Sequence, residues 1–155
     1  MKMGKRTMAA LGAVLMTVLA AGAATAAQPL RESLFYEDDV LTLCSFPVLA
    51  EFTANKEYVT FFEDRVLVTG KLFVRLTNLD DPSNSLTLNI SGPAHISELS
   101  ERYAGRGLFL LFPEDVGGPG LVLTTGRVDV VRGEDGFVTN FSVKGNSVDI
   151  CAALA

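Results

Sequence analysis

The longest regular pattern in the chain is an alternation of apolar and polar positions between Arg65 and Thr77. Its apolar even positions are Val66, Val68, Leu72, Val74 and Leu76. Successive side chains of a β-strand point to opposite faces of its sheet, so this pattern predicts one long amphipathic strand. We expect the even positions to be buried, and Lys71 and Arg75 to reach solvent. Gly70 keeps the phase, which predicts a bend or space for a large residue on a facing strand.

Shorter apolar or alternating segments flank this strand and are separated by turn-forming residues, such as Glu63-Asp64. The segments cover residues 40–44, 48–52, 58–62, 86–90, 108–112, 120–125, 127–131, 137–144 and 148–150. Many short strands joined by turns rich in Gly, Asn, Asp and Pro are typical of antiparallel all-β domains. We therefore expect an all-β fold, either an antiparallel β-sandwich or a flattened β-barrel, with about eight to ten strands.

One stretch, between Ala94 and Ala104, is ambiguous. Ile96, Leu99 and Tyr103 recur there at helical spacing, and the following Gly105 could cap a helix. A single short helix and an irregular connection are the two alternatives, so the fold contains at most one short helix.

The first 27 residues have the order of a secretory signal peptide. A basic start precedes an apolar stretch at 8–19 and a run of small residues at 20–27. The best A-x-A cleavage site is Ala24-Thr25-Ala26, which predicts cleavage after Ala26; cleavage after Ala27 is the alternative. The uncharged stretch is also long enough for a transmembrane anchor. The small residues in its second half favour the signal peptide.

This interpretation divides the chain into a signal peptide, residues 1–26, and a single secreted β domain, residues 27–155. Cleavage would remove three of the 13 basic residues and none of the 18 acidic residues, which leaves a formal charge of −8. An acidic surface argues against nucleic acid as a partner and, after cleavage, against a membrane. A charge of this size also opposes self-association, so we expect a monomer.

Two cysteines, Cys44 and Cys151, stand near the ends of this domain. An even number of cysteines in a protein bound for an oxidising compartment favours mutual pairing. We therefore predict a Cys44–Cys151 disulfide.

Residues with catalytic or metal-binding potential are few. The only histidine, His95, follows a Gly-Pro pair in an expected loop, and no G-x-S-x-G motif is present. Most carboxylates form adjacent pairs in expected turns, where they are typically solvated. Asn78, Asp80, Asp81 and Asn84 supply oxygens that calcium prefers, but without the spacing of a calcium-binding loop. We assign no catalytic, cofactor-binding or metal-binding residue.

Several short stretches resemble small uncharacterised secreted proteins of actinobacteria. They lie at residues 43–48, 77–79, 88–93, 120–127 and 149–154. The resemblance implies an exported domain with a cysteine near each end and brings with it no catalytic residue.

The leading functional hypothesis is a non-enzymatic secreted domain that binds an extracellular ligand or protein. β domains host many unrelated functions, so this inference is by analogy. One alternative is a small extracellular hydrolase that uses carboxylates, with or without a bound cation. Another is a secreted protease inhibitor that presents a rigid loop such as Pro113–Pro119.

The signal peptide gives a direct prediction about processing. Because small residues precede both cleavage points, we expect the exported protein to begin at Ala27 or Gln28. N-terminal sequencing of secreted protein measures this directly. Recovery of the intact Met1 segment in a membrane fraction would contradict both the cleavage and the release of the domain.

Overall fold

One antiparallel sheet contains all nine strands of the computed structural model, which describes residues 28–155. The elements are β1 (Leu30–Ser33), β2 (Asp39–Leu41), β3 (Val48–Phe61), β4 (Val66–Asn78), β5 (Ser85–Asn89), β6 (Ala94–Ile96), β7 (Ser100–Leu111), β8 (Gly120–Arg132), β9 (Val138–Asp149) and α1 (Ile150–Ala153). The expected all-β, antiparallel fold with one short helix is confirmed. The predicted signal peptide lies outside the described residues.

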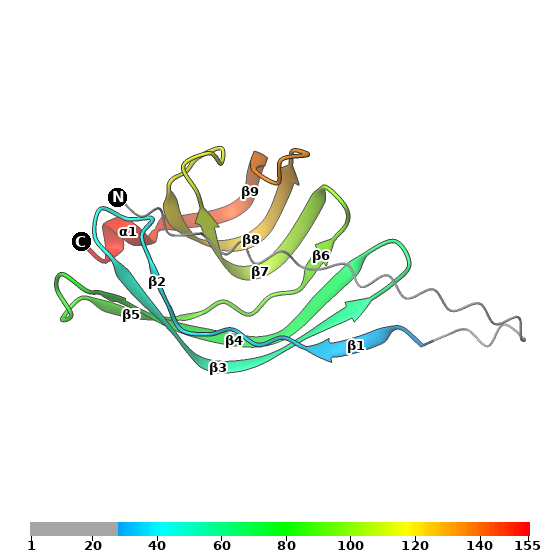
Figure 1. Ribbon diagram of the computed structural model, residues 1–155, viewed down its shortest axis with the longest axis horizontal. Helices are drawn as coiled ribbons and strands as arrows, with labels where there is room; N and C mark the ends of the chain where they lie inside the picture. The colour runs from blue at the N-terminus through cyan, green and yellow to red at the C-terminus, as the bar shows by residue number, and fades with distance from the viewer. Residues whose placement is uncertain (1–27) are drawn as a thin grey trace, which may run out of the picture.

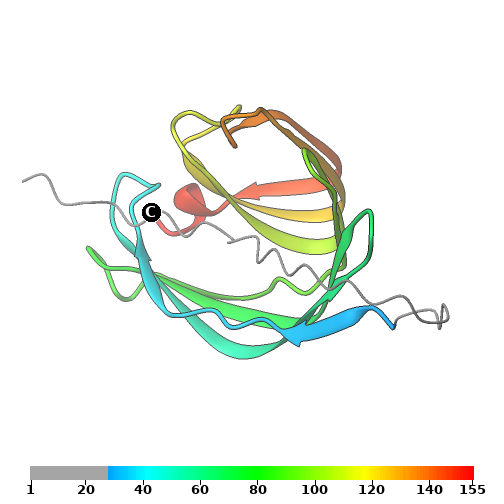
Figure 2. The same ribbon diagram turned by 45° about the vertical axis from the view of Figure 1, so that its right-hand side comes forward.

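The sheet is open and bends over on itself into two layers (Figures 1 and 2). Its strand order is β1-β3-β4-β6-β7-β8-β9, with β2 added beside β3 and β5 beside β4. The two halves of β4 pair with different strands: its first residues pair with β6 and its last residues with β5. This split leads the sheet from one layer, formed by β1 to β5, into the other, formed by β7 to β9.

The long strand predicted from the alternation is β4, which pairs with β3 through a tight turn closed by a bond from Phe62 N to Arg65 O. Its predicted faces are confirmed for residues 71–76: Leu72, Val74 and Leu76 are buried, and Lys71 and Arg75 are exposed. Val66 and Val68 at its start are only half-buried. The layers are therefore less tightly packed at that end of β4.

An inter-layer core fills the other end of the fold. Its fully buried members are Val48, Ala50, Val74, Leu76, Leu121, Ile150 and Leu154. The last two come from α1 and its C-terminal cap, so the short helix closes this end. Cys44 and Cys151 form the predicted disulfide beside the core, across a sequence separation of 107 residues. In the chain-entropy model, closing a loop of about 100 residues stabilises a fold by roughly 4.7 kcal/mol.

The structure corrects several of the expected segments, and residues 120–125 and 127–131, for example, are parts of one strand, β8. The segments 48–52 and 58–62 are the two halves of β3, joined through a bulge between Phe52 and Ala54. Residues 94–104 contain β6 and the start of β7, which pair with each other, so both alternatives for this stretch, a helix and an irregular connection, are wrong. The helix instead begins at Ile150, where a strand was expected, because the Asp149 side chain caps it by accepting a bond from Ala152 N.

Glycines in register bend β7, β8 and β9. Gly105 faces Gly126, which in turn faces Gly145, and all three have positive φ angles. A Cβ atom at Gly126 would lie 2.4 Å from Lys144 O, and one at Gly145 would lie 2.0 Å from Thr125 O. Only glycine fits such a close approach in this conformation. The row of glycines therefore permits the strong curvature of these strands seen in Figure 1.

α1 has four residues, and no helix within residues 28–155 has the length and apolar character needed to span a membrane.

The buried and exposed faces of β4 predict opposite outcomes for two neighbouring substitutions. Val74→Asp places an unpaired charge in the inter-layer core and should lower the free energy of unfolding by at least about 3 kcal/mol. Arg75→Ala changes an exposed side chain and should alter it by no more than about 0.5 kcal/mol. Denaturant unfolding of both variants measures this difference. Equal losses would contradict the assigned faces.

Candidate functional site

A cavity of about 450 Å³ lies between the layers and is called here the inter-layer cleft. Its apolar lining consists of Phe52, Val68, Leu72, Ile90, Gly92, Ala94, Ile96, Ala104, Gly107, Leu108, Phe109, Leu110, Leu111, Val130, Val138 and Phe141. Its polar lining consists of Tyr36, Glu57, Tyr103, Arg106 and Arg132. This volume, with a mainly apolar wall and a few polar groups, is characteristic of small-molecule sites.

Glu57 is the most deeply buried charged group of the cleft, with 5% of its surface exposed. The bulge in β3 changes the phase of the strand, so that Glu57 and Val59 continue the buried face begun by Val48 and Ala50. Its partner across the sheet is Gly70, which has no side chain. A Cβ atom at Gly70 would lie 2.6 Å from Glu57 Cα, so the glycine is needed for this approach. Gly70, which was predicted to allow either a bend or space for a large facing residue, thus makes room beside a buried acid.

Tyr36, from the segment between β1 and β2, covers Glu57. Its hydroxyl donates to Glu57 Oε2 at 3.0 Å, and its ring stacks on Phe52 with centroids 5.1 Å apart. Burial raises the pKa of Glu57, and the bond from Tyr36 offsets part of that rise. Burial and the neighbouring carboxylate also raise the pKa of Tyr36, which keeps its hydroxyl a donor.

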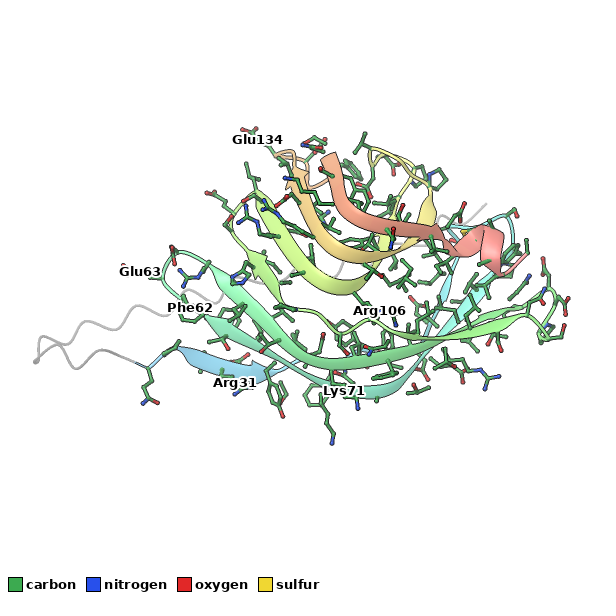
Figure 3. The ribbon with its side chains drawn as sticks, turned by 180° about the vertical axis from the view of Figure 1, so that it is seen from behind. Arg31, Phe62, Glu63, Lys71, Arg106 and Glu134 are labelled. Carbon is green, nitrogen blue, oxygen red and sulfur yellow. A yellow bond between two sulfur atoms is a disulfide. The ribbon has the colours of Figure 1, made fainter. Side chains whose placement is uncertain are left out.

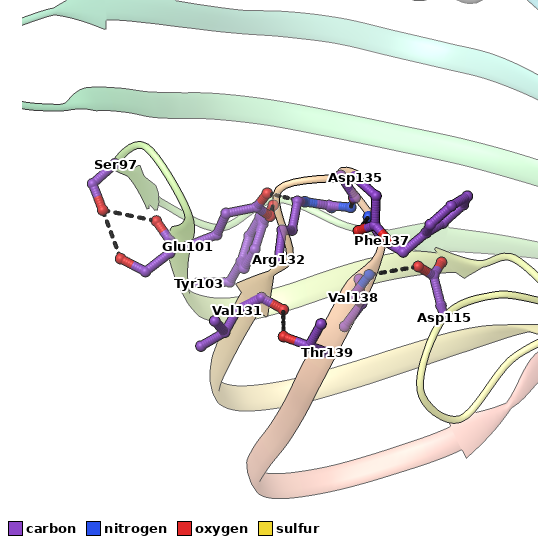
Figure 4. A network of polar contacts seen from close by, with 12 residues as sticks. Ser97, Glu101, Tyr103, Asp115, Val131, Arg132, Asp135, Phe137, Val138 and Thr139 are labelled. Carbon is purple, nitrogen blue, oxygen red and sulfur yellow. Dashed lines mark hydrogen bonds and ion pairs between the residues drawn. The ribbon is translucent and has the colours of Figure 1, made fainter.

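The opposite wall carries Tyr103 and Arg132, which both bind Glu101, a carboxylate that is not part of the cleft lining (Figure 4). Tyr103 donates to Glu101 Oε2, while Arg132 Nε donates to Glu101 Oε1 at 2.5 Å. The ring of Tyr103 packs edge-on against Phe109, 4.8 Å between centroids. Burial raises the pKa of Tyr103, with smaller contributions that include Glu101 and Tyr36.

Glu57 and Glu101 differ in whether a positively charged side chain offsets their negative charge. Glu101 has an arginine partner, and this contact raises the pKa of Arg132. Within residues 28–155, Glu57 forms no ion pair. Arg106 also lacks an ion pair in this part of the chain, but it is exposed and lies between the layers (Figure 3). The cleft thus combines one buried carboxylate and one exposed cation with an apolar wall.

His95 lies away from the inter-layer cleft, on β6, rather than in the expected loop. It is exposed and lines an outer depression of about 670 Å³ with Arg102, Arg127 and Asp129. Hydrogen bonds from Arg127 and Arg102 lower the pKa of Asp129. The depression is larger than the cleft, but its charged groups mainly satisfy one another. We therefore take the cleft as the candidate site.

The oxygen-rich segment 78–84 is a turn in which side chains hold the backbone. Asn78 Oδ1 accepts bonds from Asp80 N at 2.9 Å and Asp81 N at 3.2 Å, and Asn78 Nδ2 donates to Leu154 O. These bonds fasten β4 to the end of α1. Within residues 28–155, no group of three or more His, Cys, Asp or Glu side chains could hold a metal ion.

The loop Pro113–Pro119 is anchored by Asp115, which is 6% exposed. Its two carboxylate oxygens accept bonds from Phe112 N and Val138 N, each at 2.7 Å. Figure 4 shows the bond from Val138. Asp115 therefore departs from the expectation that paired carboxylates are solvated. It ties the loop to the start of β9, on the rim of the cleft.

Sequence reasoning missed Glu57 and Glu101. Glu57 lies two positions before the apolar Val59, which indicates that both side chains are on the same face of a strand. The bulge after Phe52 shifts this alternation out of phase with the first half of β3, so the pattern around Glu57 is short. The signal for Glu101 is its spacing of two from Tyr103, in a segment that also shows helical spacing. Neither residue has an acidic neighbour in the sequence, whereas most carboxylates of the chain form adjacent pairs.

No protein-family model, curated protein or solved structure matches the chain. The resemblance to secreted actinobacterial proteins therefore stays a prediction.

The raised pKa of Glu57 makes the stability of the fold depend on pH. Above its raised pKa, Glu57 is ionised in the folded protein, and this lowers the free energy of unfolding. Below the ordinary pKa of glutamate, Glu57 is protonated in both the folded and the unfolded protein, so this loss of stability is absent. Glu57→Gln should therefore melt at a higher temperature than wild type at neutral pH, and this advantage should disappear near pH ~4. Calorimetric melting at several pH values measures it.

A matched control is Glu51→Gln, on the opposite face of the same strand. This variant should melt close to wild type at both pH values. A Glu57→Gln protein that melts below wild type at neutral pH would show that the carboxylate stabilises the fold.

Proposed function

We propose that the domain is a secreted, non-enzymatic binding protein that holds a small, largely apolar molecule in the inter-layer cleft. The observation that carries this proposal is the cleft itself, about 450 Å³ in volume and mainly apolar, with its few polar groups on facing walls. Sites of this kind bury most of a small ligand and orient it through a few polar contacts.

Export is the second part of the proposal. The predicted signal peptide motivates it, and the Cys44–Cys151 bond supports it, because such bonds persist mainly in oxidising compartments.

The chemistry of the cleft favours binding over nucleophilic catalysis. An activated serine or cysteine needs a base within hydrogen-bonding reach, which is most often histidine. The single histidine of the chain lines the outer depression, and both cysteines are in the disulfide. The remaining ionisable groups of the cleft suit the recognition of a ligand.

A carboxylate hydrolase is the second candidate, favoured by one observation. Glu57 is a buried acid whose pKa is raised, as general acids require. Such an enzyme also needs a second carboxylate that faces the substrate. Glu57 is the only carboxylate in the cleft lining of the described residues, and both oxygens of Glu101, which lies outside that lining, accept bonds from Tyr103 and Arg132. Binding is therefore the better supported function.

The proposal predicts that filling the cleft abolishes binding. Val68→Trp places a bulky side chain on the cleft-facing side of β4, and we expect it to weaken binding of the neutral apolar dye Nile red by at least about tenfold. Dye fluorescence measures the affinity, and mass spectrometry of solvent extracts from secreted protein should find a co-purifying molecule in wild type only.

The control is Thr69→Trp, one residue along the same strand and on its opposite face. It should bind the dye like wild type. Equal binding by all three proteins would place the dye elsewhere and contradict the proposed site.

A further inference from the structure

Glu57 has an unused acceptor atom. Tyr36 donates only to Oε2, and Oε1 accepts no hydrogen bond from residues 28–155. Every fully buried side-chain nitrogen or oxygen atom in this part of the chain has a hydrogen-bond partner. Oε1, which has no such partner, is therefore not fully buried, and Glu57, which is 5% exposed as a whole, lines the cleft. A ligand donor could bind this atom without displacing Tyr36.

A buried carboxylate without a counter-ion carries an electrostatic cost that a cation would offset. Arg132 does not fill this role, because its guanidinium is bound to Glu101 and to Gly136 O. Arg106 is exposed and forms no ion pair with Glu57. A positively charged group of a ligand could therefore act as the counter-ion of Glu57.

The surroundings of Glu57 also suit a cation. The ring of Tyr36, which is hydrogen-bonded to Glu57, stacks on Phe52, and both rings line the cleft. Aromatic rings attract ammonium groups through their electron-rich faces, most strongly where water is excluded. The formal charge of −8 left on residues 27–155 by the predicted cleavage would further favour the approach of cations.

We infer that the inter-layer cleft selects apolar amines, with the protonated nitrogen at Glu57 Oε1 and the hydrocarbon or aromatic body against the apolar wall. This inference rests on the proposed binding function and adds the chemical class of its ligand. The competing possibility is an apolar anion held by Arg106. The exposed guanidinium of Arg106 is hydrated in the free protein, whereas Glu57 is desolvated before a ligand arrives.

The test compares three probes with the same ten-carbon chain: n-decylamine, n-decanol and decanoate. Calorimetry at neutral pH with the disulfide-bonded protein should give n-decylamine an affinity at least about tenfold above that of n-decanol, with decanoate weakest. Glu57→Gln should bring the amine to within about twofold of the alcohol and leave the affinity for the alcohol unchanged. The control Glu51→Gln removes the same charge outside the cleft and should keep the preference for the amine.

Each other outcome is decisive. Equal affinity for amine and alcohol, or an amine preference that survives in Glu57→Gln, would overturn the choice of ligand class and leave the proposed cleft function standing. Tighter binding of decanoate would assign the polar head to Arg106 and overturn the inference in the same way. Failure of all three probes, together with dye binding that Val68→Trp does not alter, would overturn the proposed function itself.

Discussion

A single sheet must cover its own apolar face, and this constraint governs the rest of the structure. The sheet covers this face by bending into two layers. Two features permit the bend: β4 pairs with β6 at one end and β5 at the other, and glycines lie in register on β7, β8 and β9. At one end, α1 and the inter-layer core fill the space, and the bond from Asn78 to Leu154 fastens the helix. At the other end no helix of the described residues fills the space, and the inter-layer cleft remains between the layers.

The sequence predicted those parts of the fold in which one regular pattern runs unbroken. The sequence of β4 keeps a period of two from Val66 to Leu76, so the position of the strand and the faces of its second half follow from the alternation. β3 is equally long, but a single extra residue after Phe52 reverses its faces, and the pattern divides into two shorter segments. The first turn of α1 depends on a side-chain cap at Asp149, which is a local contact that periodicity does not describe.

The candidate site was less predictable, because its residues come together only after the sheet has bent. Tyr36 and Glu57 are 21 residues apart, and Glu101 and Arg132 are 31 residues apart. Neither spacing forms a motif. The two acids also look alike in the sequence, yet one has an arginine partner and the other has only a phenol. That difference in counter-charge leaves Glu57 without an ion pair within residues 28–155, and it is a property of the assembled sheet.

The row of glycines has a consequence for how copies of the chain meet one another. Within the described residues β9 is an edge strand, and the backbone donors and acceptors on such an edge can pair with a strand of another molecule. Propagation of such pairing into fibres requires a long, flat ribbon. Gly145 bends this edge halfway along its length, and Lys144 places a charge beside the bend. The curvature that leaves the inter-layer cleft between the layers thus also opposes aggregation through the edge strand β9.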